Sequence, residues 1–164
     1  MKNVKLLLLP IACLLIFLFA VTAGPICNYV LSPAYVKDYY GDSYQELLRP
    51  TPLAGYIAGK QVISQADKAF SSFLDRESAE ACFGMLGRYC IHSDSYPEAI
   101  RQTHNLRMLA AHTNHDSGYV WVRYTSKAYD REGIMITGSS NVYSRWTLER
   151  QDGIWVVTDI QEHP

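Results

Sequence analysis

Charged side chains are missing from a long stretch near the start of the 164-residue chain. Between Lys5 and Lys37 the chain has no Asp, Glu, Lys or Arg. A stretch of this kind excludes a solvated surface element, because such elements alternate apolar and charged positions. It predicts that the protein enters or crosses a membrane.

An excess of positive charge is also lacking. The chain has 15 Lys and Arg against 16 Asp and Glu, for a net charge of −1. Removing Lys2 and Lys5, which precede the charge-free stretch, leaves 13 basic against 16 acidic residues, or −3. A slightly acidic chain without a basic stripe gives no electrostatic basis for binding nucleic acid, so we expect no nucleic-acid partner.

Recognisable catalytic and cofactor motifs are absent as well. Gly138-Ser139-Ser140 lacks the Gly-x-Ser-x-Gly elbow of hydrolases and indicates a bulge or bend in a strand. His112, His115 and Asp116 lie close together, but zinc sites usually draw on two separated ligand pairs and no second pair is present, so a polar hairpin turn is favoured. We therefore expect no metal, no cofactor and a non-enzymatic protein.

Cysteine is sparse, with four residues in the chain, three of them beyond the apolar start: Cys27, Cys82 and Cys90. An odd number cannot pair completely within one chain. A Cys82–Cys90 bridge needs a turn between the two residues, because eight residues of straight helix separate them by about 12 Å. Gly84 and Gly87 make such a turn possible. Buried reduced thiols are the favoured interpretation, and the bridge remains the alternative.

The N-terminal segment has two possible roles. Lys2 and Lys5 followed by the apolar run Leu6–Ala20 match a secretory signal, and Val21-Thr22-Ala23 offers small residues for cleavage before Gly24. Residues 6–24 are also long enough for an uncleaved membrane anchor, since roughly 17–25 residues span a bilayer. Cleavage of residues 1–23 is slightly favoured. Both alternatives predict a domain outside the cytoplasm, secreted, periplasmic or anchored.

The next part of the chain divides into a lead-in and a helical region. Scattered prolines and glycines predict an irregular lead-in or stalk over residues 24–63, with a short helix at Tyr44–Arg49. A domain then follows over residues 64–164. Apolar residues at helical spacing predict an amphipathic helix from Ser64 to Leu74, and a second helix capped by Ser78 extends toward Cys90.

The last third of the chain is rich in β-branched and aromatic residues interrupted by turn signals. It predicts four strands, at residues 106–113, 119–129, 134–150 and 154–161. Short turns make neighbouring strands antiparallel. The fold class is therefore α+β, with N-terminal helices packed on a curved four-stranded antiparallel sheet.

The final hairpin allows a prediction of register. Asp152-Gly153 favours a two-residue type I′ turn, so residues whose numbers sum to 305 face each other. Leu148 then opposes Val157, and Trp146 opposes Asp159 on the inner, apolar face. A carboxylate beside an indole would have its pKa raised by desolvation, which makes Asp159 the weak candidate for a catalytic base.

The segment 146–157, Trp-Thr-Leu-Glu-Arg-Gln-Asp-Gly-Ile-Trp-Val-Val, resembles the closing hairpin of the NTF2-like, cystatin-like superfamily. Element order over residues 64–161 is similar too. The resemblance implies a curved sheet wrapped over helices, often with a pocket inside the cone. It implies no single reaction, since this superfamily includes isomerases, dehydratases, transport factors and extracytoplasmic assembly domains.

Three function classes follow. The favoured one is an exported or membrane-anchored non-catalytic domain that binds an unknown protein or small-molecule ligand. The alternatives are a small-molecule isomerase or dehydratase that uses Asp159, and a structural subunit of a secretion or conjugation complex. Four aromatic residues are candidates for a ligand pocket: Trp121, Tyr143, Trp146 and Trp155. The membrane is a partner through residues 6–24 if that segment is not cleaved.

Overall fold

The computed structural model describes residues 2–162, with side chains described at residues 11, 13–16 and 22–162. The chain forms two compact units, Met1–Thr51 and Pro52–Pro164. The first unit is helical, with α1 (Lys2–Leu31), α2 (Ala34–Tyr40) and the 3-10 helix η1 (Gly41–Leu48). Asn28 Nδ2 donates a hydrogen bond to the Leu47 carbonyl at 3.0 Å, which joins the end of α1 to the end of η1.

The prediction of an irregular lead-in over residues 24–63 is therefore corrected, because most of this range is helical. The prolines in this range do not interrupt the helices. Pro33 and Pro52 stand directly before α2 and α3, where a residue without an N–H group does not interrupt the helical hydrogen bonds. The predicted helix at Tyr44–Arg49 corresponds to the second half of η1.

Among the residues searched, which are those that the structure describes, no helix combines the length and the apolar character needed to cross a membrane. The predicted signal or anchor segment, residues 1–23, lies largely outside the described side chains.

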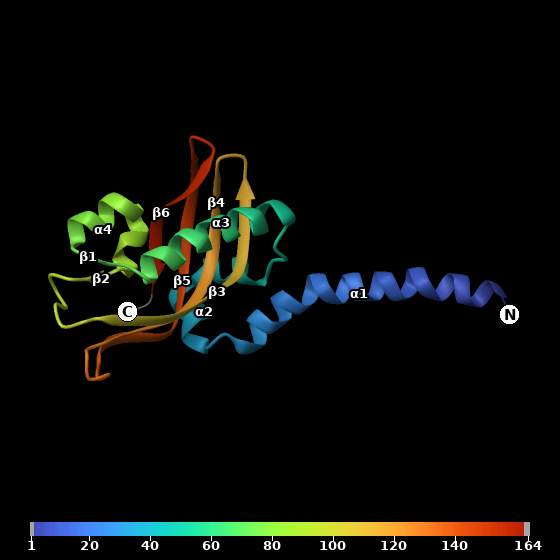
Figure 1. Ribbon diagram of the computed structural model, residues 1–164. Coiled ribbons are helices and arrows are strands. Elements are labelled where there is room, and N and C mark those ends of the chain that lie inside the picture. Colours follow the sequence, from blue (N-terminus) through green and yellow to red (C-terminus); the bar gives the residue numbers. More distant parts are fainter. Residues whose placement is uncertain (1, 163–164) are drawn as a thin grey trace. The chain divides into compact units, whose positions relative to one another are not determined.

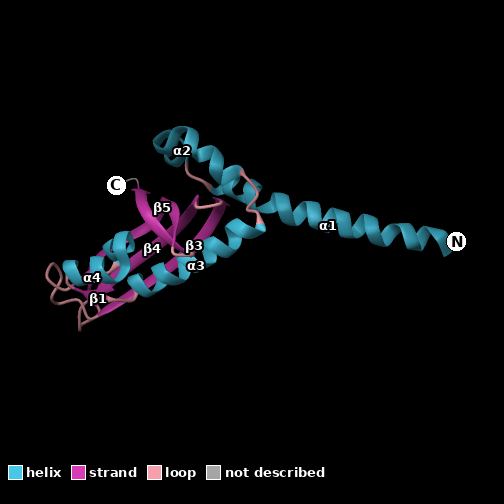
Figure 2. Cartoon of the chain, turned by 90° about the horizontal axis from the view of Figure 1, so that it is seen from above, coloured by secondary structure: helices cyan, strands magenta, loops and turns pink. Residues whose placement is uncertain are grey.

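The second unit contains α3 (Leu53–Phe70), β1 (Phe73–Leu74), α4 (Arg76–Phe83), the 3-10 helix η2 (Gly84–Tyr89), β2 (Ile91–His92) and four long strands. These strands are β3 (Arg101–Asn114), β4 (Ser117–Tyr129), β5 (Met135–Gln151) and β6 (Ile154–Glu162). They form an antiparallel meander in the order β3-β4-β5-β6, while β1 and β2 pair in parallel. Helix α3 crosses one face of the meander (Figures 1 and 2). The predicted α+β class and strand order are confirmed.

Helix α3 begins at Leu53, eleven residues before the predicted start at Ser64. Its buried face continues toward the N-terminus through Gly55, Gly59 and Val62, at helical spacing. A Cβ atom at Gly55 would lie 2.3 Å from the Ala111 carbonyl oxygen of β3, and one at Gly59 would lie 2.4 Å from Met108 Sδ. These glycines allow the helix to pack directly against the strand backbone.

The core lies between α3, α4, η2 and the inner face of the sheet. Val62, Ala66 and Phe70 of α3 pack in one buried cluster with Trp146 and Leu148 of β5. This cluster belongs entirely to the second unit. The apolar face predicted for the last hairpin is therefore the face that meets the helices.

Helix α4 begins earlier and ends earlier than predicted. Asp75, not Ser78, is its N-cap, and the Asp75 carboxylate accepts hydrogen bonds from the Ser78 N–H at 2.9 Å and the Ser78 hydroxyl at 2.7 Å. The N–H bond is the main reason that the pKa of Asp75 is lowered. At Gly84 a φ of +56° ends the α-helix, and the chain tightens into η2.

Cys82 is exposed, Cys90 is buried, and both are free thiols. Burial is the main cause that raises the pKa of Cys90 to about 11, with a further contribution from Cys82. Of the two alternatives left by the sequence, the structure contains the unbridged thiols.

The β5–β6 hairpin has the predicted turn, with φ of +50° at Asp152 and +82° at Gly153. Four pairs nearest the turn follow the predicted register, including Leu148 with Val157. A bulge then shifts the pairing by one residue, so that Trp146 opposes Ile160 and Asp159 opposes Thr147. The predicted pairing of Trp146 with Asp159 is wrong.

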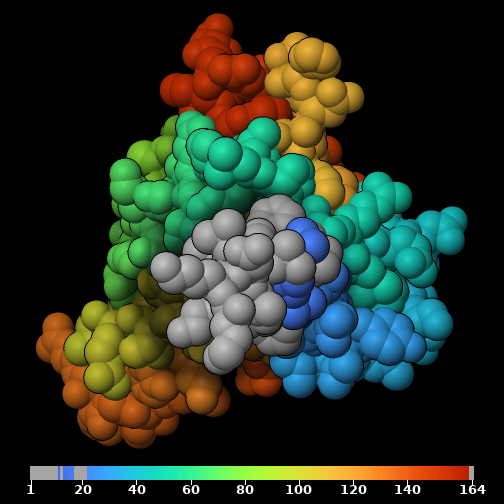
Figure 3. Space-filling view, turned by 90° about the vertical axis from the view of Figure 1, so that its right-hand side faces the viewer, coloured from blue at the N-terminus to red at the C-terminus, as the bar shows by residue number. Residues whose placement is uncertain are grey.

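The turns of β3–β4 and β5–β6 lie side by side at one end of the sheet (Figures 1 and 3). The Arg150 N–H donates to the Asp116 carbonyl at 2.8 Å between them. His112, His115 and Asp116 thus belong to a hairpin whose last pair is Asn114 with Ser117, as the sequence predicted. Within the described residues, no group of three or more His, Cys, Asp or Glu side chains is placed to hold a metal ion.

Candidate ligand pocket

A pocket of about 320 Å³ opens between the inner face of the sheet and the segment from η2 to β2. Phe70 of α3 and Arg76 of α4 also line it. Small-molecule sites in proteins usually measure roughly 300–1,000 Å³, so the volume suits a small organic ligand. The remaining lining residues come from η2 through the loop after β2 and from three strands: Arg88, Tyr89, Cys90, Ile91, His92, Ser95, Tyr96, Gln102, Tyr124, Ser126, Ala128, Thr137, Gly138 and Ser139.

Aromatic rings form the inner wall of this pocket. The Phe70 ring stacks on Tyr89 with a centroid distance of 4.5 Å and packs against Tyr124 at 5.1 Å. Tyr89 and Tyr124 meet edge to face at 5.3 Å. The His104 ring also stacks on Phe70, at 5.3 Å, and its Nε2 lies 2.7 Å from Asp67 Oδ1. The wall is therefore a packed aromatic surface whose position is fixed by several ring contacts.

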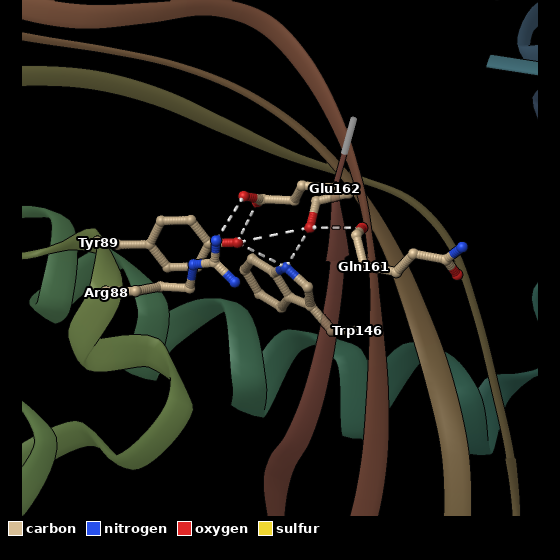
Figure 4. A network of polar contacts seen from close by, with 6 residues as sticks. Arg88, Tyr89, Trp146, Gln161 and Glu162 are labelled. Atoms are coloured by element: carbon tan, nitrogen blue, oxygen red, sulfur yellow. Dashed lines mark hydrogen bonds and ion pairs between the residues drawn. The ribbon is translucent and has the colours of Figure 1, made fainter. Parts of the chain in front are cut away.

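A network of polar contacts lies behind that wall (Figure 4). The Trp146 indole donates from Nε1 to the Tyr89 hydroxyl at 2.9 Å and to Ser144 Oγ at 2.7 Å. Tyr89 in turn donates to Glu162 Oε1. Trp146 and Ser144 are completely buried. Buried polar groups of this kind hold side chains in one arrangement when each has a partner.

Burial and the neighbouring carboxylate set the charge state of Tyr89. Desolvation is the main cause that raises its pKa well above 10, and the negative charge of Glu162 raises it further. Tyr89 is therefore a neutral phenol at physiological pH and donates its proton in a hydrogen bond. Arg88 Nη2 lies 3.6 Å from Glu162 Oε2, and the Glu162 side chain is only 13% exposed.

Two buried polar atoms among the lining residues have no partner within the described chain: Gln102 Oε1 and His92 Nδ1. The amide nitrogen of Gln102 is fixed, because it donates to Ser126 Oγ at 2.8 Å and to the Tyr89 carbonyl at 3.4 Å. Its oxygen is left as an acceptor. An unsatisfied buried polar atom costs about 1–3 kcal/mol.

Asp159, the predicted catalytic candidate, is exposed on β6 opposite Thr147. The bulge that shifts the hairpin register gives the inner position to Ile160, which is buried in the core cluster. Asp159 is absent from the lining of the 320 Å³ pocket. The geometry on which its catalytic role depended is not present.

The four aromatic candidates have different positions. Trp146 and Trp155 belong to or pack against the core cluster, and Trp146 contributes to the network behind the pocket wall. Trp121 and Tyr143 are buried and are not members of that cluster. None of the four is among the residues that line the described pockets. Trp146 therefore does not line the pocket, and it supports the wall through its hydrogen bond to Tyr89.

The residues that shape the pocket were not predicted from the sequence, above all Tyr89, Gln102 and Glu162. One signal was available at Gln102. Strand β3 begins at Arg101, five residues before the predicted start, and Gln102 shares the inner face with Leu106 and Met108 by simple alternation. A polar residue at an inward-facing position indicates either a hydrogen-bonded network or a site.

A wider hollow of about 700 Å³ lies against η2 and β6, and its walls include Lys68, Glu80 and Phe83. We regard the 320 Å³ pocket as the candidate site, because its lining combines packed aromatic rings with two arginines, and a few polar groups on an apolar wall determine specificity.

No protein-family model matches the chain, and no curated protein matches its sequence. Solved structures do match. Aln2 from a Streptomyces species has a TM-score of 0.50 and 13% identity, covering 70% of this chain and 92% of Aln2. The Kfla4162 protein from Kribbella flavida has a TM-score of 0.43 and 10% identity, covering 66% and 89%.

A protein of unknown function with a cystatin-like fold from Nostoc punctiforme has a TM-score of 0.40 and 10% identity, covering 68% of this chain and 92% of its own. At these identities the similarity concerns the fold alone. The predicted architecture is present element by element, with α3 and α4 packed on the inner face of the β3-β4-β5-β6 meander. The described domain thus has an α+β fold, with helices packed on a four-stranded antiparallel sheet, and it is similar in fold to Aln2.

Proposed function

We propose that this protein is a non-catalytic binding domain, exported or anchored at its N-terminus, that holds a small organic ligand in the pocket beside Tyr89. The observation that supports binding is a pocket of about 320 Å³ whose lining combines packed aromatic rings with the guanidinium groups of Arg76 and Arg88. An apolar surface provides affinity by burial, and a few convergent polar atoms determine which ligand fits.

Binding explains the pocket better than the isomerase alternative does. That alternative required a carboxylate in a dry, apolar position, and Asp159 is exposed instead. Among the titratable groups of the lining, Tyr89 is held neutral and already donates to Glu162. A phenol committed to a neighbouring carboxylate suits a rigid wall, and a ligand can rest on it without exchanging a proton.

A pair of neighbouring serines allows a matched test of the site. Ser139 lines the pocket, whereas Ser140 is exposed and absent from the lining. A Ser139→Trp substitution should fill the pocket, and Ser140→Trp should leave it open. We expect at least one compound in a library of neutral, anionic and cationic aromatic fragments to raise the melting temperature of the wild type and of Ser140→Trp, but not that of Ser139→Trp. No rise in any variant, or an equal rise in all three, would contradict binding in this pocket.

Export is proposed from the basic residues, the apolar run and the small residues near Ala23. The mass of the N-terminal peptide, measured on protein from cells in which the chain is made, distinguishes the two modes. A start at Gly24 indicates cleavage, whereas retention of Met1 or Lys2 in the membrane fraction indicates an anchor. An intact N-terminus in the soluble cytoplasmic fraction would overturn the proposal of export.

A further inference from the structure

The charges around the pocket indicate which ligands it accepts. Arg76 and Arg88 both line it, and no Asp or Glu is among its described lining residues. The same two arginines also line the adjoining surface hollow, so they stand together at the mouth. A pocket whose lining has two guanidinium groups and no carboxylate attracts anions and disfavours cations.

The nearby acids neutralise only part of this charge. Glu162 pairs with Arg88 at 3.6 Å and also accepts the Tyr89 hydrogen bond. Asp75 precedes Arg76 in the chain, but its two oxygens are engaged by Ser78 at the start of α4. Glu80 shares the adjoining hollow with both arginines. Arg76 has no carboxylate pair among the ion pairs of the described chain, and the Arg88 side chain is 48% exposed, so both guanidinium groups can reach a ligand.

The interior of the pocket favours an apolar group. The aromatic wall formed by Phe70, Tyr89 and Tyr124 suits an apolar or aromatic ligand body.

We infer that the pocket binds a small organic acid with an apolar body, whose carboxylate lies at Arg76 and Arg88. This inference rests on the proposed function and specifies the ligand class. A guanidinium group binds a carboxylate through charge-assisted hydrogen bonds, which are about twice as strong as neutral ones.

Four compounds with the same phenylethyl body test the ligand class by isothermal titration calorimetry on the full-length protein. 3-Phenyllactate and 3-phenylpropionate both carry the carboxylate, 3-phenyllactamide lacks the charge, and 2-phenylethylamine carries the opposite charge. We expect the two acids to bind most tightly. The amide should bind about tenfold more weakly or worse, and the amine most weakly of all.

Substitutions assign the two contacts. Arg76→Gln and Arg88→Gln should each raise the Kd of 3-phenyllactate about three- to tenfold and leave the Kd of 3-phenyllactamide unchanged. Arg101→Gln is the matched control, because Arg101 lies over the Tyr129 ring at 4.7 Å and is not a lining residue, so its Kd should stay at the wild-type value.

The outcomes separate this inference from the proposed function. Equal or tighter binding of the amide or the amine would overturn the acid class and leave a binding pocket in place. Failure of all four compounds to bind at millimolar concentration would also overturn the acid class. The fragment experiment with Ser139→Trp and Ser140→Trp then tests binding in the pocket independently, because the fragment library includes neutral and cationic compounds.

Discussion

Tyr89 connects the core, the pocket and the end of the last strand through one hydroxyl group. Its ring stacks on Phe70, and its oxygen accepts from Trp146 and donates to Glu162. Trp146 and Ser144 are completely buried. Each hydrogen bond between these side chains and Tyr89 therefore replaces a hydrogen bond to water. Removing the hydroxyl leaves the Trp146 and Glu162 groups with fewer partners in a site with little water.

We therefore expect Tyr89→Phe to lower the free energy of unfolding by about 1–3 kcal/mol, since it keeps the ring but leaves buried partners unsatisfied. Urea denaturation measures this loss. Tyr129→Phe is the matched control, because it keeps the ring under Arg101 and should change stability by less than about 0.5 kcal/mol. An equally small effect at both positions would show that the network does not stabilise the fold.

The raised pKa of Tyr89 also predicts a loss of stability at high pH. In the unfolded chain a tyrosine ionises near pH 10, whereas burial and Glu162 keep Tyr89 protonated in the folded state to higher pH. The folded state then binds more protons than the unfolded state. The contribution of Tyr89 is complete below pH 10 and is lost as the pH rises above 10, with a slope of up to ~1.4 kcal/mol per pH unit.

Unfolding free energies measured between pH 9 and 11.5 test this slope. Cys90, whose pKa is about 11, contributes to the decline of the wild type from pH 9 upward, so the informative quantity is the difference between wild type and Tyr89→Phe. We expect that difference to shrink above pH 10. A constant difference across the range would mean that Tyr89 ionises normally in the folded protein.

At the level of elements, α3 is positioned by small residues more than by large ones. Gly55 and Gly59 stand on its buried face and meet Ala111 and Met108 of β3 at distances that leave no room for a Cβ atom. Glycine lowers helix propensity by about 1 kcal/mol relative to alanine, so the close contact must outweigh that cost. The helix depends on its contact with the sheet for stability.

Gly55→Ala should therefore destabilise the protein by about 2 kcal/mol or more, even though alanine is the better helix former, because the new Cβ would meet a backbone carbonyl that cannot rotate away. Thermal unfolding followed by circular dichroism measures the shift. Ser64→Ala, at an exposed position of α3, should change stability by no more than about 0.5 kcal/mol. A Gly55→Ala variant as stable as the wild type would contradict the close packing.

The sequence predicted the strands well and the helices less well, for physical reasons. β-Branched and aromatic residues between clear turn signals define β3 to β6 locally, and their bounds differ from the prediction by five residues or fewer. The start of α3 depends on contacts with a strand about fifty residues away, which no local pattern contains. Extending the spacing of Ala66 and Phe70 backward through Val62, Gly59 and Gly55 was the available signal.

The candidate site was hard to predict for the same kind of reason. A single bulge near Thr158 exchanges the faces of Asp159 and Ile160, and a bulge depends on strand pairing rather than on composition. Tyr89, Gln102 and Glu162 lie far apart in sequence and meet only when η2, β3 and β6 are in place. The pocket itself was implied only by the resemblance of the last hairpin.

At the scale of the whole molecule, the second unit has a core of its own. Every residue of the buried cluster lies between Val62 and Ile160, within the unit Pro52–Pro164. We expect a fragment of residues 52–164 to fold cooperatively, with one urea transition seen equally by tryptophan fluorescence and circular dichroism. Non-coincident transitions, or a fragment without fixed tertiary structure, would show that residues before Pro52 are required for the fold.

The most direct test of the account is the position of the Trp146 indole signal in a nitrogen–proton correlation spectrum during titration with 3-phenyllactate. Trp146 Nε1 donates to Tyr89 at the pocket wall, whereas Trp121 lies outside both the pocket lining and the core cluster. We predict a saturable shift of the Trp146 signal with little change at Trp121. An unchanged Trp146 signal at saturating ligand, or equal shifts of both indoles, would contradict binding at this site.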